Sequence, residues 1–480
     1  MRDVFIFIGA LALVVQAFIG LSFFISCIQE KEKRASLFAL FQFLVMIGVL
    51  IIYLIIAGAG FFHTAPGLIV LIAGYILALV SGWFLMHKTE PNTKALQGTK
   101  GLMIGPVGRF DERMHVFARN RTMRPGTEPY QTFYREHPEL EANDARRREK
   151  GGPLGHLGSI DKPYEGPNVA GTLASLTIPF NLSLPRIVKP SQHPELKGRK
   201  FDLSPEEASR RLKGYARSLG ADLVGIAEIN PLWIYSHRGE IFHENWEDWG
   251  KAIPADHKYA LVVAEEMDFD MIGPAPHTPS VMESMKEYAK GAYITTQIAA
   301  YIANMSFEAE ANHLRHYTAI LPPLAVDAGL GEVGRLGYLM TKELGPRVRL
   351  SAVTTDLPLI PDKPVDIGAE DFCTICKKCA TNCPSRSIPE EDLPKEFNGT
   401  LRWKLDAESC FEYWGKIGTD CCICMKVCPW SHARTWPHRM IVRLISRNRY
   451  ARRVFNLMDD IFYGRKPKPK AGPQWARYTE

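Results

Sequence analysis

Two cysteine-rich runs near the carboxyl end constrain the fold of this 480-residue chain more than any other feature. The first run has the spacing Cys-x-x-Cys-x-x-Cys-x-x-x-Cys-Pro, and the second run also ends in Cys-Pro. In proteins that hold two [4Fe-4S] clusters, the fourth cysteine of one run binds the cluster of the other run. The spacing therefore predicts one cluster on Cys373, Cys376, Cys379 and Cys428, and a second on Cys383, Cys410, Cys421 and Cys424.

The second run is less regular, because the gap from Cys410 to Cys421 is longer than in a ferredoxin and leaves Cys422 spare. Zinc is the alternative metal for these cysteines, but zinc sites seldom use three cysteines at Cys-x-x-Cys-x-x-Cys followed by Cys-Pro. Disulfides are less favoured still. Nine of the ten cysteines lie between positions 373 and 428, whereas a secreted disulfide scaffold spreads its cysteines along a short chain.

Three apolar stretches without charged residues open the chain, at positions 4–26, 37–59 and 66–87. Each has about the 20 residues that a helix needs to cross a hydrocarbon core of ~30 Å. A cleaved signal peptide would not be followed by two further spans, and buried helices of a soluble protein are disfavoured because charges are absent throughout. The sequence therefore predicts a three-helix transmembrane anchor over residues 1–88.

The charges between these stretches predict the orientation of the anchor. The loop 27–36 carries Lys31, Lys33 and Arg34, whereas the turn 61–66 has no lysine or arginine. Cytoplasmic loops are the ones enriched in these cations, so we expect a multi-pass protein of the inner cell membrane with everything after Lys88 on the cytoplasmic side. No twin-arginine signal precedes the first stretch, in agreement with a catalytic part that is not exported.

Alternating helix and strand patterns follow in the middle of the chain. Ser204 and Pro205 are typical of a helix start, and Gly220 of its end. Strands are expected at 222–228, 259–265 and 348–354, and a long helix at 280–305. The expected fold class is an α/β (α+β) core. The predicted domains after the anchor are a wrapping linker over 89–199, the core over 200–365, a two-cluster ferredoxin-like module over 366–435 and a basic tail over 436–480.

A net charge of +6 does not imply a nucleic-acid partner. Much of the surplus lies at 146–150 and in the arginine-rich tail. The tail is compatible with anionic lipid headgroups, although a solvated helix face is the favoured interpretation because charge runs usually lie at the surface.

A glycine motif at Gly329, Gly331 and Gly334 matches G-x-G-x-x-G, with Asp356 about twenty residues later. A nucleotide site also requires a strand directly before the first glycine. The preceding segment 322–328 is short and fits a helix at least as well, so a nicotinamide site is disfavoured. We expect these glycines to let the backbone approach a large, flat group.

Several stretches carry a likeness to one known family: 108–113, 117–119, 323–332, 345–350, 355–359 and both cysteine runs. From about Pro106 to Trp430 the chain resembles the corrinoid-dependent iron–sulfur reductive dehalogenases. The resemblance implies a nitroreductase-like core with a base-off corrinoid beside the nearer cluster. It also implies that halogen is removed from an organohalide with two electrons and a proton.

The same resemblance implies site residues. Tyr288 is similar to the proton-donating tyrosine of the family and Arg349 to its charged partner, and a nearby guanidinium would favour the phenolate. The alternative for Tyr288 is a core aromatic in a helix. His316 is a third candidate and a departure, since many family members have asparagine there. Histidine brings a charge that depends on pH, although a lone histidine is more often structural.

Partners and rival functions are also implied. The substrate would be a small organohalide and the anchor would contact membrane lipid, while the electron donor would be a quinol, a ferredoxin or a flavodoxin. One rival is a corrinoid epoxyqueuosine reductase, which acts on tRNA, needs no membrane spans and should expose a basic RNA-binding surface. The other rival is a membrane-bound electron-transfer subunit with clusters but no corrinoid.

Overall fold

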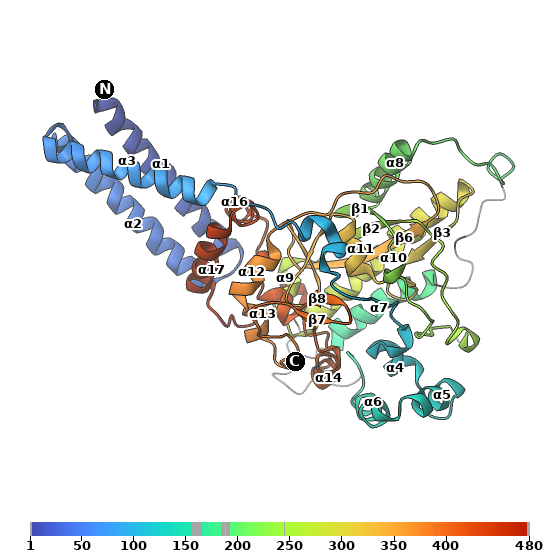
Figure 1. Ribbon diagram of the computed structural model, residues 1–480. Coiled ribbons are helices and arrows are strands. Elements are labelled where there is room, and N and C mark those ends of the chain that lie inside the picture. Colours follow the sequence, from blue (N-terminus) through green and yellow to red (C-terminus); the bar gives the residue numbers. More distant parts are fainter. Residues whose placement is uncertain (1, 155–165, 184–187, 189–192, 244, 478–480) are drawn as a thin grey trace. The chain divides into compact units, whose positions relative to one another are not determined.

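The computed structural model describes residues 2–154, 166–183, 188, 193–243 and 245–477, and these form two compact units (Figure 1). One unit comprises Met1–Pro91 and His432–Lys468, and the other Asn92–Ser431 and Pro469–Glu480. We call them the anchor unit and the core unit. This division is coarser than the five predicted segments, and most of the basic tail belongs to the anchor unit.

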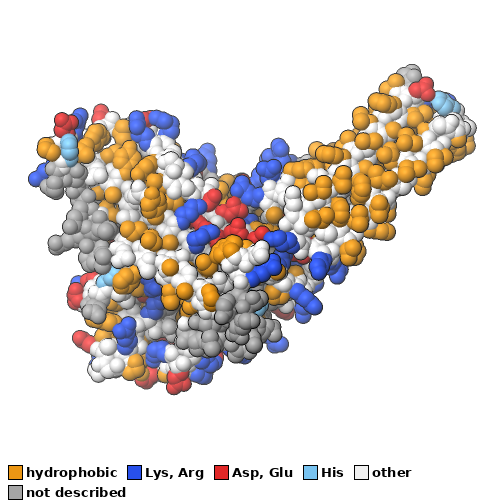
Figure 2. Space-filling view, turned by 180° about the vertical axis from the view of Figure 1, so that it is seen from behind, with side chains coloured by type: hydrophobic (Ala, Val, Ile, Leu, Met, Phe, Trp, Pro, Cys, Tyr) orange, Lys and Arg blue, Asp and Glu red, His pale blue; other side chains and the backbone are white. Residues whose placement is uncertain are grey.

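Three long helices make up most of the anchor unit: α1 (Arg2–Gln29), α2 (Lys33–Gly58) and α3 (Ala65–Met86). The three expected apolar stretches are therefore confirmed as helices, each long and apolar enough to cross a membrane. Thr64 begins α3 by accepting a hydrogen bond from the Gly67 amide at 3.2 Å, after the short helix η1 (Phe61–His63). Hydrophobic side chains cover the visible face of these helices (Figure 2).

The C-terminal helices α16 (Trp436–Ile445) and α17 (Arg449–Tyr463) pack against the apolar helices within the same unit. The Asn448 side chain joins them, because its amide donates to the carbonyls of Phe84 and His87 at the end of α3, at 2.7 and 2.6 Å. The apolar face of α17 packs on α1 and α2. Five arginines of this tail are exposed, as the solvated-face interpretation expects: Arg439, Arg443, Arg447, Arg449 and Arg453. Arg452 is an exception, because it is buried and donates to the Ile445 carbonyl at 2.8 Å.

A four-stranded sheet organises the core unit, with the strand order β1-β2-β6-β3 and antiparallel pairing throughout. Its strands are β1 (Leu223–Glu228), β2 (Tyr259–Glu266), β3 (Ala309–Asn312) and β6 (Val348–Thr355). The three expected strands are confirmed, and β3 is an addition. Because every pair is antiparallel, the core belongs to the α+β class. It contains no parallel βαβ unit among its described strands.

Helices cover both faces of this sheet (Figure 1). On one face, α8 (Pro205–Ser218) and α10 (Thr278–Asn304) bury Leu212, Ile294 and Ile298 against the strands. On the other face, α11 (Leu321–Asp327) buries Leu324. With both faces of the sheet covered, β1 and β2 are apolar at most positions and could be found in the sequence, whereas β6 also carries Arg349, Ser351 and two threonines.

The expected start of α8 is confirmed, because the Ser204 hydroxyl accepts from the Glu207 amide at 3.2 Å. The segment 89–199 is more helical than its composition suggests, and α7 packs along α10. Its elements are η2 (Ala95–Leu102), η3 (Glu112–Met114), α4 (Val116–Thr122), α5 (Glu128–Glu136), α6 (Pro138–Lys150) and α7 (Gly166–Leu182).

Short elements surround the sheet and carry the cysteine runs. Before the first run lie η4 (Pro231–Trp233), η5 (Trp246–Asp248), α9 (Phe269–Ile272), β4 (Gly331–Val333) and β5 (Leu339–Thr341). From the first run onward lie α12 (Ala369–Cys376), α13 (Lys378–Thr381), β7 (Lys395–Phe397), β8 (Thr400–Arg402), α14 (Ala407–Ile417), α15 (Ile423–Lys426), η6 (Pro429–Ser431) and η7 (Gln474–Ala476).

A buried carboxyl group between the sheet and α10 makes stability depend on pH. Glu265 is fully buried, and its Oε1 accepts from the Ser351 hydroxyl at 3.1 Å. Burial raises the pKa of Glu265 to about 8, above the 4.5 of an unperturbed glutamate. The unfolded chain loses this proton near pH 4.5 but the folded chain only near pH 8, so the stability is full below pH ~4.5 and decreases as the pH rises to about 8.

We expect Glu265→Gln to remove this dependence. The melting temperature of the wild-type protein in detergent, followed by tryptophan fluorescence, should fall between pH 6 and pH 9. The free energy of unfolding of the variant should decrease less over that range, by a difference on the order of a few kcal/mol. Equal slopes for the two proteins would show that Glu265 is not the group responsible.

Candidate active site and cysteine sites

The first group of predicted cluster ligands comes from two short helices and the end of a third. Cys373 and Cys376 lie on α12, Cys379 on α13, and Cys428 two residues beyond the end of α15. Burial, together with repulsion from Cys376, Cys373 and Cys379, raises the pKa of Cys428 well above its usual value. The structure thus brings the last cysteine of the second run to the first three of the first run, which is the crossed arrangement that the spacing predicts.

The second group is assembled in the same way. Burial and repulsion from Cys383 raise the pKa of Cys410, on α14, to about 12. Burial and repulsion from Cys421 and Cys410 likewise raise the pKa of Cys424 well above its usual value. No disulfide joins the cysteines in the part of the chain that the structure describes. Which metal these two groups hold stays a prediction.

The glycine motif supports the first cysteine run instead of opening a cavity. A Cβ on Gly331 would lie 2.0 Å from the Met340 carbonyl oxygen, and one on Gly329 would lie 2.5 Å from the Lys363 carbonyl oxygen. At Gly334 the nearest atom is Met340 Cγ, at 2.6 Å. The chain itself therefore fills the space beside these glycines, and their predicted contact with a cofactor draws no support from the structure. The element before them is the helix α11, so the strand that a nucleotide fingerprint requires is absent there.

Two charged residues of the same segment hold the start of the first cysteine run. The Glu332 carboxylate accepts from the amides of Ile367 and Gly368 at 2.5 and 2.8 Å, just before α12 begins. The guanidinium of Arg335 donates to the Cys373 carbonyl at 2.9 Å, and the Arg335 amide donates to Cys373 Sγ at 3.5 Å. Arg335 is fully buried. It places a fixed positive charge beside the thiols of this group, and nothing in the sequence pattern singled it out.

The motif at 345–350 holds the second cysteine run against the sheet. A Cβ on Gly345, whose φ is +58°, would lie 2.6 Å from the Trp430 carbonyl oxygen, so the backbones touch there. Arg347 donates from Nε to the Ser431 carbonyl at 2.9 Å. Arg349, two residues further along β6, also contacts this part of the chain, at Asp420 and Met425.

Arg349 is the centre of the candidate active site. Its guanidinium donates to the Ser284 hydroxyl at 2.6 Å and forms an ion pair with Asp420 at 3.2 Å. It also lies 5.1 Å from the centre of the Tyr288 ring, a cation–π distance. Burial opposes the charge, but Tyr288, Cys422 and Asp420 raise the pKa of Arg349 above its usual value. Arg349 therefore carries a permanent positive charge.

Two tyrosines flank this cation. Tyr288 lies on α10 and is partly exposed. Tyr338 lies between β4 and β5, close to Cys410, Cys424, Arg349 and Tyr288, and burial raises its pKa well above the usual value. The structure thus brings Tyr288 and Arg349 together and places them beside the second cysteine group. It leaves Arg349 Nε, a buried donor, without a hydrogen-bond partner among the described residues.

His316 belongs to a different network. Its Nε2 lies 3.0 Å from Glu310 Oε1, its Nδ1 lies 3.4 Å from Arg238, and its backbone pairs with His313. In the part of the chain that the structure describes, it makes no hydrogen bond or ion pair with Tyr288 or Arg349. The role predicted for His316 stays a prediction, and these contacts are those of a structural residue.

Ser284, Asp420 and Tyr338 were missed by the sequence reasoning. Ser284 precedes Tyr288 by one helical turn, a spacing at which two residues share one face of a helix. That spacing was the only available signal. Asp420 directly precedes the Cys421 pair, but no pattern ties an aspartate at that place to an arginine 71 residues earlier.

Comparisons with known proteins find similar chains, although no family model matches. The chain is 36% identical over 281 residues to a tetrachloroethene reductive dehalogenase of Desulfitobacterium hafniense, covering 50% of each chain. It is 32% identical over 296 residues to the enzyme of that name from Sulfurospirillum multivorans, covering 55% of this chain and 58% of the relative. An epoxyqueuosine reductase of Cyclobacterium marinum is 31% identical over 131 residues, 24% of this chain and 37% of the relative.

A solved structure shows the same fold. The catabolic reductive dehalogenase NpRdhA, in complex with 3-bromo-4-hydroxybenzoic acid, matches with a TM-score of 0.60 and 27% identity, over 77% of this chain and 48% of that chain. The core is thus of the reductive dehalogenase fold. Over about half of its length the chain is similar in sequence to curated tetrachloroethene reductive dehalogenases, and it carries three apolar N-terminal helices. It spans about half the length of the curated relatives that it matches.

Proposed function

We propose that this chain is a membrane-anchored reductive dehalogenase, which replaces the halogen of a small organohalide with hydrogen. The overall reaction consumes two electrons and one proton and releases a halide ion. The observation that carries the proposal is the convergence of Tyr288, Arg349 and the second cysteine group in a chain that is related to reductive dehalogenases in sequence and in fold.

The cysteines fit two [4Fe-4S] clusters in a ferredoxin-like module. Repulsion from Cys373, Cys376 and Cys379 on Cys428, and from Cys383 on Cys410, supports the crossed arrangement of two-cluster proteins. Cys373, Cys376, Cys379 and Cys428 would hold one cluster, and Cys383, Cys410, Cys421 and Cys424 the other. The neighbouring Cys422 is occupied otherwise, since its Sγ lies 3.3 Å from Asp420 Oδ1 and 3.7 Å from the Ser284 hydroxyl.

The corrinoid and the nitroreductase-like nature of the core are proposed from the resemblance and from the relatives. The orphaned Nε of Arg349 is the feature of this structure that fits an additional group at the site, whereas the glycine motif does not form a cradle for it. When bound, the clusters would supply single electrons at potentials as low as about −700 mV, and the corrinoid would supply the cobalt at which the carbon–halogen bond breaks.

The protein's own part in this chemistry is to deliver a proton and to stabilise charge. The Tyr288 hydroxyl would give its proton to the carbon that loses the halogen, which leaves a phenolate. Arg349 would stabilise that phenolate and any negative charge that develops beside it, because its own charge is permanent and partly desolvated. Asp420 and Ser284 would position Arg349, since both bind the same guanidinium nitrogen.

The three helices α1 to α3 would span the membrane, with the core on the cytoplasmic side. The exposed arginines of α16 and α17 support this orientation. Their helices pack on the anchor near the loop that carries Lys31 and Lys33, and Arg34 Nε donates to the Ile461 carbonyl of α17 at 3.1 Å. Cations thus gather at the loop end of α1 and α2, as they do on cytoplasmic sides. A membrane quinol, a ferredoxin or a flavodoxin would supply the electrons.

Halide release tests the proposal directly. The full-length protein, purified without oxygen in detergent and reduced with a viologen dye, should release chloride or bromide from a chlorinated ethene or a brominated phenol. No tRNA should be needed. Reduction of an epoxyqueuosine-containing tRNA without halide release would favour the modification enzyme. Electron transfer from quinol to a partner, without either reaction, would favour a relay subunit.

A further inference from the structure

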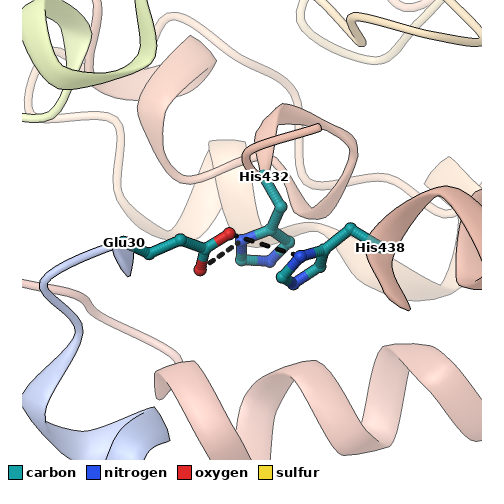
Figure 3. A group of neighbouring side chains, drawn as sticks. All are labelled: Glu30, His432 and His438. Carbon is teal, nitrogen blue, oxygen red and sulfur yellow. Dashed lines mark ion pairs between the residues drawn. The ribbon is translucent and has the colours of Figure 1, made fainter. Parts of the chain in front are cut away.

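The anchor unit contains a cluster of metal-ligating side chains that the proposed dehalogenation does not use. Glu30 directly follows the first apolar helix α1, and His432 and His438 lie at the start of the C-terminal tail, 402 and 408 residues later in the chain. In the folded unit the two imidazole rings converge on the Glu30 carboxylate (Figure 3). Glu30 and His438 are buried, and His432 is mostly buried.

The geometry points to a metal ion, and we propose that these three side chains bind one divalent transition-metal ion such as zinc. Glu30 Oε2 lies 3.8 Å from His432 Nδ1, and Glu30 Oε1 lies 3.4 Å from His438 Nδ1. The three ligand atoms all lie within 4.8 Å of one another. Ligand atoms around a tetrahedral zinc ion with bonds of 2.0–2.1 Å are separated by about 3.3 Å, so small movements suffice.

The outer nitrogens of both histidines are held as they are in known metal sites. A histidine that binds metal through one ring nitrogen commonly donates its other N–H to a carboxylate or a similar acceptor. Here His432 Nε2 lies 2.8 Å from Asp459 Oδ1, and His438 Nε2 lies 2.9 Å from the Tyr463 hydroxyl. Asp459 and Tyr463 both lie on α17 and are buried. Both rings are therefore oriented with Nδ1 toward Glu30.

Other contacts limit the site. Glu30 Oε1 accepts from the Ala433 amide at 3.1 Å, and Oε2 accepts from the Tyr463 hydroxyl at 3.0 Å. The Thr435 hydroxyl lies 2.8 Å from His438 Nδ1 and would have to turn away when a metal binds. Two histidines and one glutamate leave one position of a tetrahedral ion for water, as in other zinc sites with this ligand set.

Such an ion would link the end of α1 to the C-terminal helices of the anchor unit. It would join the lipid-facing part of the unit to α16 and α17 by bonds that do not depend on burial of apolar surface. The proposed ion takes no part in the chemistry of the core unit. It would stand even if the proposed dehalogenation failed.

Zinc content and zinc X-ray absorption of the full-length protein test this inference. Wild-type protein with its full iron content, purified in detergent and dialysed with zinc, should hold about one zinc ion per chain. Its absorption spectrum should show nitrogen and oxygen neighbours at 2.0–2.1 Å. Glu30→Gln and His432→Ala should each reduce bound zinc at least tenfold. His63→Ala, which changes an exposed histidine of the same unit, should leave it unchanged.

Three outcomes would overturn the inference. Sulfur neighbours at about 2.3 Å would place the zinc on cysteines that lack their clusters. Zinc content unaffected by either substitution would mean adventitious binding. Wild-type protein with less than about a tenth of an equivalent would mean no site. Because the wild-type spectrum alone distinguishes imidazole from thiolate neighbours, the test holds even if the variants fail to fold.

Discussion

Replacing Tyr288 with phenylalanine should abolish turnover while leaving the iron and corrinoid contents unchanged. The substitution removes only the hydroxyl and keeps the ring that lies 5.1 Å from the Arg349 guanidinium. A positioned proton donor typically contributes 10²–10⁴-fold to a rate, so halide release with a reduced dye should fall at least about 100-fold. Substrate affinity should change much less, because the apolar surface of the ring is retained.

Tyr293→Phe is the matched control. Tyr293 lies five residues further along α10, and half of its surface is exposed. It should lose no more than about half of the activity. If Tyr288→Phe retains a third or more of wild-type halide release with normal cofactor content, Tyr288 is not the proton donor, and the interpretation of it as a core aromatic becomes the better one.

Replacing Arg349 with methionine should damage both folding and activity. The substitution leaves Asp420, which is almost completely buried, without its ionic partner. Removing one member of a buried ion pair typically costs about 3–5 kcal/mol. We therefore expect a clear drop in melting temperature, together with loss of halide release of at least about 100-fold, since the charge that stabilises the phenolate is gone.

The double variant Arg349→Met with Asp420→Asn separates these two effects. Removing both charges should restore most of the melting temperature, because no uncompensated carboxylate is left in the interior. Activity should stay low. Ser284→Ala, which removes the hydroxyl that binds Arg349 and Asp420 but no charge, should have a smaller effect on both measurements than Arg349→Met. Full activity in the double variant would show that Arg349 serves only to neutralise Asp420.

The parts of the fold that the sequence predicts share a simple physical signature. The helices α1 to α3 are charge-free over about twenty residues each, and the strands β1 and β2 are apolar at most positions. By contrast, α7 was missed. It contains Pro179 and many small residues, and it is recognisable only by its packing on α10. The antiparallel strand order was also out of reach, because pairing depends on distant segments.

In the candidate site, too, residues in local patterns could be predicted, whereas contacts between distant segments could not. The crossing of the two cysteine runs follows from local spacing, and the structure assembles the thiols in that way. Tyr288 and Arg349 were reached through a family resemblance, and the structure brings them together. Asp420 and Ser284 come from segments 136 residues apart, and their joint contact with Arg349 has no counterpart in any local pattern. His316, selected as a departure from a family pattern, is held by Glu310 and Arg238 instead.

The metal and corrinoid content of the full-length protein tests the central proposal most directly. Protein purified without oxygen from a host that makes corrinoids should contain about eight iron atoms in two [4Fe-4S] clusters. It should also contain one cobalt per chain, extractable as a corrinoid. Zinc or disulfides at the eight cysteines, or iron at this level with no cobalt, would contradict the proposal.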